Sequence, residues 1–86
     1  MNVNTAEMDQ FMMFPNPGDG SIFLAFPEPG DYLIRVFGTD GRLVRSEDLS
    51  TVEGVWKLDM TGEKNGIYLI TVEGNGDSFT RKYVKE

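Results

Sequence analysis

Cysteine and histidine are both absent from this chain of 86 residues. The lack of cysteine excludes disulfide bonds, thiolate metal sites and a thiol nucleophile, so the fold has to be stabilised by packing. The lack of histidine removes the commonest general base and the commonest ligand of transition metals. Both absences argue against an enzyme, and we expect no catalytic residue, no cofactor and no bound metal ion.

Long hydrophobic runs are also missing. No stretch approaches the ~20 apolar residues that a membrane-spanning helix needs, and no cationic segment followed by an apolar one opens the chain. We therefore expect no membrane span and no N-terminal export signal. Residues 1–10 are polar and aperiodic, which is typical of a linker, so the chain is expected to be either cytoplasmic or a piece of a longer protein.

Positive charge is scarce and unevenly placed. Eight Lys and Arg residues stand against fourteen Asp and Glu, and the formal net charge is −6. This balance argues against nucleic acid and anionic lipid as partners, because binding them requires clustered cations. Residues 77–86 are the local exception, since they hold three cations, Arg81, Lys82 and Lys85, and only two anions. The simplest interpretation is an edge strand that its charges protect from pairing.

Apolar residues make up 40% of the chain and aromatic residues 12%, which is enough for one domain with one core. A domain of this size buries only somewhat more than ~60% of the surface that its unfolded chain exposes, which favours a thin, two-layer arrangement. Short apolar runs alternate with turn signals and show no helical period. The sequence therefore predicts an all-β, immunoglobulin-like β-sandwich of about seven antiparallel strands.

The alternation of apolar and polar residues predicts which side chains face the core. By residue range, the expected strands are 11–14, 21–26, 32–37, 42–49, 55–60 and 67–73, followed by a return strand that ends near residue 84. The expected inward residues are Ile22, Leu24, Phe26, Tyr32, Ile34, Val36, Val44, Trp56, Leu58, Met60, Tyr68, Ile70 and Val72. We expect Arg42 and Arg45 to remain in solvent and residues 50–54 to form a polar loop.

An internal similarity links two predicted hairpins. The set Gly30, Tyr32, Leu33, Ile34, Val36 and Gly38 recurs 36 residues later as Gly66, Tyr68, Leu69, Ile70, Val72 and Gly74. Two copies are too few for a solenoid, so the similarity indicates either convergent hairpin chemistry or an old duplication inside one domain. Tyr68 follows a polar crossing, which predicts a tyrosine corner whose hydroxyl returns to the crossing backbone.

Other chemistry has weaker support. Paired acids such as Glu47 and Asp48 would suit a glycosidase, and aspartates beside glycines would suit calcium, but no complete oxygen-ligand loop is present. These aspartates are Asp19, Asp40 and Asp77, and turn formation explains them better. Trp56 would stack on sugars if it were exposed, but its phase with the inward residues of its strand places it in the core.

Three blocks of the sequence carry a family resemblance. Residues 14–24, FPNPGDGSIFL, hold a proline-asparagine-proline motif, a glycine turn and a strand; residues 34–46, IRVFGTDGRLVRS, form a hairpin that contains glycine-arginine; residues 58–86 hold a glycine-x-tyrosine strand, a hairpin and a lysine-bearing last strand. In order, spacing and position they resemble the C-terminal sorting domain of the type IX secretion system of Bacteroidetes, also called the Por secretion system.

The resemblance implies an immunoglobulin-like domain that directs an attached cargo protein across the outer membrane. The cargo, often a peptidase, glycosidase or adhesin, would reach the periplasm by a signal at the front of the parent protein. The outer-membrane machinery would recognise the domain, and a sortase-like peptidase would remove it and anchor the cargo to lipopolysaccharide. Residues 1–13 would be linker and the start of the first strand, and residues 14–86 the sorting domain, expected to be a monomer.

Residues that match the family motifs are candidates for recognition by the translocon. They are Pro15, Asn16 and Pro17 in the first block, Gly41, Arg42 and Val44 in the second, and Gly66, Tyr68, Lys82 and Lys85 in the third. Arg81 joins them because the address is expected on an exposed cationic face around Arg81, Lys82 and Lys85. We expect residues 83–86 to contribute little to the core. The alternative is an extracellular structural or carbohydrate-binding sandwich without a sorting role.

Overall fold

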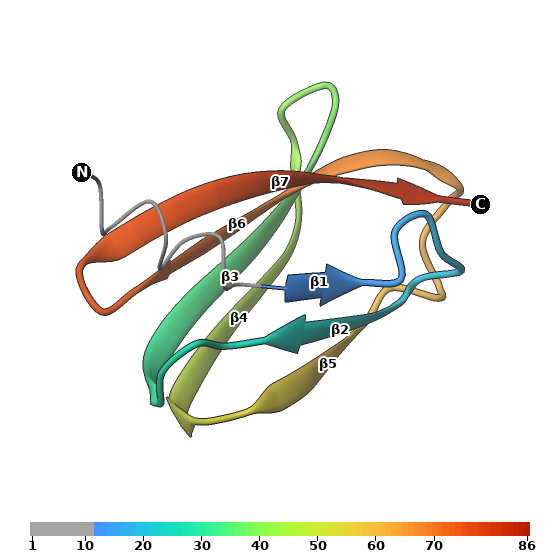
Figure 1. Cartoon of the computed structure of the whole chain (residues 1–86). Coiled ribbons are helices and arrows are strands. Elements are labelled where there is room, and N and C mark those ends of the chain that lie inside the picture. The colour runs from blue at the N-terminus through green and yellow to red at the C-terminus, as the bar shows by residue number, and fades with distance from the viewer. Residues whose placement is uncertain (1–11) are drawn as a thin grey trace, which may run out of the picture.

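The computed structural model describes residues 12–86, which form seven strands and no helix (Figure 1). The strands are β1 (Met12–Phe14), β2 (Ser21–Ala25), β3 (Gly30–Gly38), β4 (Leu43–Val52), β5 (Val55–Asp59), β6 (Gly66–Gly74) and β7 (Asp77–Lys85). The expected linker, residues 1–10, and the first residue of the expected first strand lie outside this range. The described residues form no helix that is long and apolar enough to cross a membrane.

The strands form two antiparallel sheets. One has the order β1-β2-β5 and the other the order β4-β3-β6-β7. Figure 1 shows the two sheets as separate layers, with β1 below β7 and the C-terminus beside the β1–β2 connection. The predicted all-β sandwich is confirmed.

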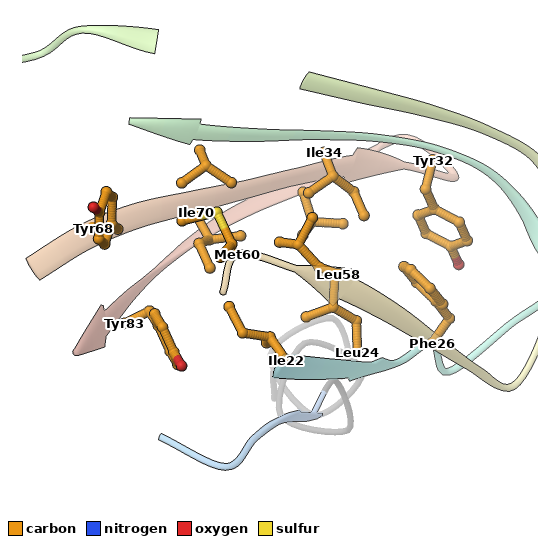
Figure 2. Close-up of a cluster of buried hydrophobic side chains, with 12 residues drawn as sticks. Ile22, Leu24, Phe26, Tyr32, Ile34, Leu58, Met60, Tyr68, Ile70 and Tyr83 are labelled. Carbon is orange, nitrogen blue, oxygen red and sulfur yellow. The ribbon is translucent and has the colours of Figure 1, made fainter. Parts of the chain in front are cut away.

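The core lies between the two sheets and is built from alternate residues of the strands (Figure 2). Its buried apolar residues are Ile22, Leu24, Phe26, Tyr32, Ile34, Val36, Leu58, Met60, Tyr68, Ile70, Val72 and Tyr83. The predicted inward positions are confirmed for all of these except Tyr83, which was not predicted. Val44 and Trp56 are partly buried and pack against the cluster.

The edge strand β4 differs from its prediction in two ways. It continues to Val52, where a loop was expected from residue 50. Val36 pairs with Arg45 and Ile34 pairs with Glu47, and directly opposed residues of antiparallel strands share a face. Arg45 and Glu47 therefore point to the core side.

Arg45 is not left in solvent. Its side chain is 34% exposed, its Nη2 atom lies 3.2 Å from Glu47 Oε2, and its Nη1 atom donates a hydrogen bond of 2.9 Å to the Asp59 carbonyl of the other sheet. The prediction of a solvated residue is wrong for Arg45 and correct for Arg42, which is exposed. Inward charges of this kind discourage an edge strand from pairing with another chain.

The sequence similarity has a geometric counterpart in the four-stranded sheet. β3 and β6 are neighbours, and Arg35 lies directly opposite Thr71, which is the same 36-residue offset that separates the two copies. Tyr32 pairs with Gly74, and Gly38 pairs with Tyr68. The hairpins β3–β4 and β6–β7 are thus related by a local two-fold arrangement about the centre of the sheet, which places Tyr32 and Tyr68 at opposite ends of the sandwich.

Candidate recognition site

The motif residues lie at one end of the sandwich, which we call the motif end. It comprises the segment 15–20, residues 39–44 of the β3–β4 hairpin, residues 60–69 including the crossing 60–65, and the terminal residues 82–86. The opposite end, called the far end, comprises the connections 27–29, 53–54 and 75–76. At the far end Asn75 and Gly76 both have positive φ, 53° and 81°, as a two-residue type I′ hairpin turn requires.

Asn16 attaches the first motif to the outer edge of β7. Its Nδ2 group donates a hydrogen bond of 2.8 Å to the Lys82 carbonyl, and its Oδ1 atom accepts one of 3.0 Å from the Val84 N–H. One amide side chain thereby pairs with an edge strand as a neighbouring backbone would. Pro15 and Pro17, on either side, follow cis peptide bonds and are exposed.

Gly18 continues this attachment through its backbone. Its N–H donates to the Val84 carbonyl over 3.0 Å, and its carbonyl accepts from the Glu86 N–H over 2.8 Å. A Cβ atom at this position would lie 2.9 Å from both the Pro15 carbonyl oxygen and the Tyr83 hydroxyl oxygen. Such contacts are too short for a real side chain, so the close approach of this segment to β7 depends on glycine.

Tyr83 lies beneath the same segment, at the end of the core that Figure 2 shows beside Tyr68. It is fully buried, and its hydroxyl accepts a hydrogen bond of 2.8 Å from the Gly20 N–H. Burial raises the pKa of the Tyr83 phenol because it disfavours the charged form. The expectation that residues 83–86 contribute little to the core is therefore wrong.

Lys85 is also turned inward, and the prediction that it lies on an exposed face is wrong. Only 7% of the residue is exposed, and its Nζ atom donates a hydrogen bond of 3.0 Å to Asn65 Oδ1 in the crossing. In the same crossing, the Tyr68 hydroxyl donates a hydrogen bond of 2.6 Å to the Lys64 carbonyl. The predicted tyrosine corner is confirmed, and the last strand is joined to the crossing beside it.

The three C-terminal cations do not share one face. Lys82 pairs with Leu69, whereas Arg81 pairs with Ile70, which is buried in the core. Lys82 therefore projects from the outer face of the sheet, and Arg81 projects from the core side, where its guanidinium lies 5.7 Å from the centre of the Phe79 ring. Both are exposed, but the predicted single cationic surface is wrong.

The second motif forms the turn of the β3–β4 hairpin. The Gly38 N–H donates to the Arg42 carbonyl over 2.9 Å, and the Arg42 N–H donates to Asp40 Oδ1 over 3.1 Å. Gly41 has a φ of 86°, a conformation that glycine adopts without strain. The interpretation of aspartates as turn residues is confirmed for Asp40, and for Asp19, whose Oδ1 accepts from the Ser21 N–H over 3.0 Å.

A cleft of about 540 Å³ separates this turn from the crossing. Four of the predicted residues line it, namely Arg42, Val44, Gly66 and Tyr68. Gly41 belongs to the turn itself. Five others gather around the end of β7, namely Pro15, Asn16 and Pro17 beside it and Lys82 and Lys85 within it. The structure thus brings the motif residues to one end, in two adjoining groups, and leaves Arg81 on the core side of β7.

Sequence reasoning missed four residues that hold the motif end together, Gly18, Gly20, Asn65 and Tyr83. In the sequence, Gly18 and Gly20 indicate only a turn, and Asn65 is only one polar residue of the crossing before Tyr68. Tyr83 carried a signal, because a two-residue turn at Asn75 and Gly76 sets the β6–β7 register and places Tyr83 opposite the inward Tyr68. No local pattern indicates that Asn16 would bond to a strand 66 residues away.

The site shows no arrangement for metal binding. Within residues 12–86, His, Cys, Asp and Glu side chains nowhere gather in a group of three or more that could hold a metal ion. Glu47, one of the paired acids that would suit a glycosidase, forms an ion pair with Arg45.

A family comparison agrees with the position of these motifs. The model of the family described as "Secretion system C-terminal sorting domain" matches residues 12–86, which is nearly the whole chain and the whole of the described sandwich. No curated protein matches the chain closely enough to be counted as a relative. The chain therefore belongs to the C-terminal sorting domain family of the type IX secretion system.

Proposed function

We propose that this domain carries an attached cargo protein across the outer membrane and that the motif end presents the address. The observation that carries the proposal is the construction of that end. Asn16 and Gly18 attach the first motif to the last strand, and Lys85 attaches the last strand to the crossing. A machinery that reads this end would read a surface that exists only when the C-terminus is present and folded.

Within this proposal the candidate residues divide by exposure. Pro15, Pro17, Arg42 and Lys82 are exposed and available to a partner, whereas Tyr68 and Lys85 are buried. The exposed residues would contact the machinery directly. The buried ones would act by holding the surface in shape, so they are positioning residues.

The proposed route begins in the periplasm and ends at the cell surface or in the medium. The cargo precedes the domain in the parent protein, and the domain acts as a monomer. A sortase-like peptidase cleaves upstream of the folded sandwich, whose first strand begins at Met12, and anchors or releases the cargo. Cleavage there would leave the hydrogen bonds of the motif end intact.

Export by a fused reporter tests the proposal. All 86 residues are joined behind a periplasmic reporter in a bacterium that has this secretion system, and reporter is measured in the periplasm, on the surface and in the medium. We expect to find reporter on the cell surface or in the medium. This exported reporter should be absent when the outer-membrane translocon is deleted. A reporter without the tail is the control, and periplasmic retention of the tailed reporter would overturn the proposal.

Cleavage is tested separately by the intact mass of the exported reporter. In the normal strain we expect a product that has lost the sandwich, residues 12–86. In a strain without the sortase-like peptidase we expect the product to keep the tail. If the product exported by the normal strain retains the whole tail, the proposed cleavage is wrong, whereas the proposed export still stands.

The alternative of a carbohydrate-binding module relied on an exposed tryptophan. Trp56 is instead partly buried and packs against the core cluster, so it is not the exposed ring that such a module presents to a sugar. This packing favours the sorting function over the alternative.

A further inference from the structure

The outer face of the four-stranded sheet is divided into two unlike halves. Because opposed residues share a face, the register of β3, β4, β6 and β7 arranges its side chains in rows. Towards the far end the rows are Asp48, Leu33, Glu73 and Ser78, then Ser46, Arg35, Thr71 and Thr80. Towards the motif end they are Leu43, Phe37, Leu69 and Lys82, then Ile67 and Val84.

The motif-end rows form an apolar surface in which Lys82 is the one charged member. We call Phe37, Leu43, Ile67, Leu69 and Val84 the outer apolar patch. Leu43 is 50% exposed, Ile67 45% and Leu69 40%, whereas Phe37 and Val84 are half-buried between them. Contiguous exposed apolar surface on a small domain is a common mark of an interaction site.

The far-end half of the same face has ordinary surface chemistry. Arg35 lies 3.9 Å from Glu73 in an exposed ion pair. Asp48, two serines, two threonines and a single apolar residue, Leu33, complete the rows. Both halves belong to the same strands, so the need for β-forming residues cannot explain why only one half is apolar. The difference indicates that the motif-end half has a partner.

The outer apolar patch is continuous with the cleft at the motif end. Leu43 and Ile67 belong to both, and Arg42 and Lys64 line the cleft beside them. Asp40 and Glu63 also line it, and the Asp40 carboxylate already accepts the Arg42 N–H. Three exposed cations, Arg42, Lys64 and Lys82, thus border an apolar surface on a chain whose net charge is −6.

We propose that the outer apolar patch is the surface through which the domain docks on a protein segment of the outer-membrane machinery that carries apolar side chains and carboxylates. This inference rests on the function proposed above. The apolar side chains would cover Leu43, Leu69 and Ile67, and the carboxylates would lie near Lys82 and Arg42. A second copy of the chain fits less well, because it would bring the same cations, and a net charge of −6, against each other.

The double variant Leu43→Ser/Leu69→Ser tests the apolar part in the 86-residue reporter fusion. We expect exported reporter to fall about tenfold or more, because loss of desolvated apolar contacts at an interface commonly reduces affinity by that factor. The matched control is Leu33→Ser, which alters the far-end half of the same face and should leave export unchanged. Thermal unfolding of each purified tail shows whether the variants remain folded.

Charge reversal tests the polar part without changing apolar area. Lys82→Glu should reduce export about tenfold, and Lys57→Glu, an exposed change on the other sheet, should leave it unchanged. The Lys82 carbonyl that bonds Asn16 is retained in this variant. If the double variant and Lys82→Glu, both folded, export as well as the wild-type tail, the patch is not the docking surface although the proposed function stands. If the wild-type tail itself exports nothing, the proposed function fails and the docking surface with it.

Sedimentation of the purified chain tests the competing possibility that a second copy of the chain covers the patch. The purified 86-residue chain should remain monomeric at micromolar concentration. A dimer that Leu69→Ser dissociates would assign the patch to a second copy and overturn the inference.

Discussion

Tyr32 and Tyr68 occupy equivalent places in the two related hairpins, yet they stand at opposite ends of the sandwich. Each is nearly buried, and each hydroxyl donates a hydrogen bond of 2.6 Å to the carbonyl four residues earlier, Glu28 for Tyr32 and Lys64 for Tyr68. The sequence similarity therefore repeats a tyrosine corner as well as a strand pattern. In this respect the two ends are alike.

The surroundings of the two corners differ. At the far end, Tyr32 stacks on Phe26 with ring centres 4.4 Å apart, and its hydroxyl accepts a hydrogen bond of 2.8 Å from Asn75 Nδ2. At the motif end, bonds join residues more than sixty positions apart, including Asn16 with Val84 and Gly20 with Tyr83. The repeated pattern thus builds the core, and the residues that are not repeated join the two termini of the sandwich.

Among changes to residues that are not repeated between the two ends, removal of the Tyr83 side chain should reduce stability most. Tyr83→Ala deletes a fully buried aromatic ring and the acceptor for the Gly20 N–H, so we expect the free energy of unfolding to fall by about 3–5 kcal/mol. Chemical denaturation measures it. Phe79→Ala, at a partly buried site of the same strand, should cost less, and an equal or smaller loss for Tyr83→Ala would contradict the assigned packing.

A methyl group at Gly18 should have the next largest effect. Gly18→Ala places Cβ against the Pro15 carbonyl and the Tyr83 hydroxyl, and overpacking of this kind costs about 1–3 kcal/mol. Gly62→Ala is the matched control, since a Cβ there meets no atom within 4 Å. Equal stability of the two variants would show that the segment does not depend on close contact with β7.

The two tyrosine corners should differ modestly from each other. Tyr68→Phe removes one hydrogen bond and should cost about 1 kcal/mol. Tyr32→Phe removes the corresponding bond and also leaves the exposed Asn75 amide without its acceptor, so its cost should be larger by a few tenths of a kcal/mol to about 1 kcal/mol. Chemical denaturation measures both losses. A larger loss of unfolding free energy for Tyr68→Phe than for Tyr32→Phe would contradict this prediction.

Alkaline pH should produce a loss of stability that involves both ends. Burial raises the pKa of Tyr32 and of Tyr83 above the ordinary value of 10.0. Above pH 10 the unfolded chain releases these protons before the folded chain does, so the free energy of unfolding falls as pH rises through the folded pKa values. Denaturation between pH 8 and about pH 12 measures the slope. Tyr83→Phe should make the slope shallower, and an unchanged slope would exclude Tyr83 as its source.

Much of the fold was predictable because the alternation of apolar and polar residues along a strand indicates which side chains face the core. This prediction failed in β4, where the charged residues Arg45 and Glu47 point inward. At an edge strand a charged side chain can reach the rim of the sandwich, as Arg45 does at the Asp59 carbonyl, so the rule that charges face solvent loses its force. The buried Lys85 was accessible to reasoning, because the two-residue turn at the far end sets its register, but its charge suggested exposure.

The candidate site was predictable only as separate motifs. The family resemblance identified Asn16, Arg42 and Tyr68 as motif residues, and each lies at the motif end. Their assembly depends on contacts between distant segments, such as the bonds of Asn16 to β7. Periodicity carries no information about such contacts, because one side-chain amide and one glycine backbone make them.

Surface reporter measured for two folded tails, Lys82→Glu and Lys85→Met, tests the central claim most directly. That claim is that the address is read from exposed residues of the motif end, whereas buried residues of the last strand act through the fold. Met at position 85 keeps the packed stem and removes only the ammonium that bonds Asn65. We predict that a folded Lys85→Met tail loses export only as far as its stability falls, whereas Lys82→Glu loses export about tenfold at unchanged stability. Normal export of Lys82→Glu together with loss of export by a folded Lys85→Met would contradict the account.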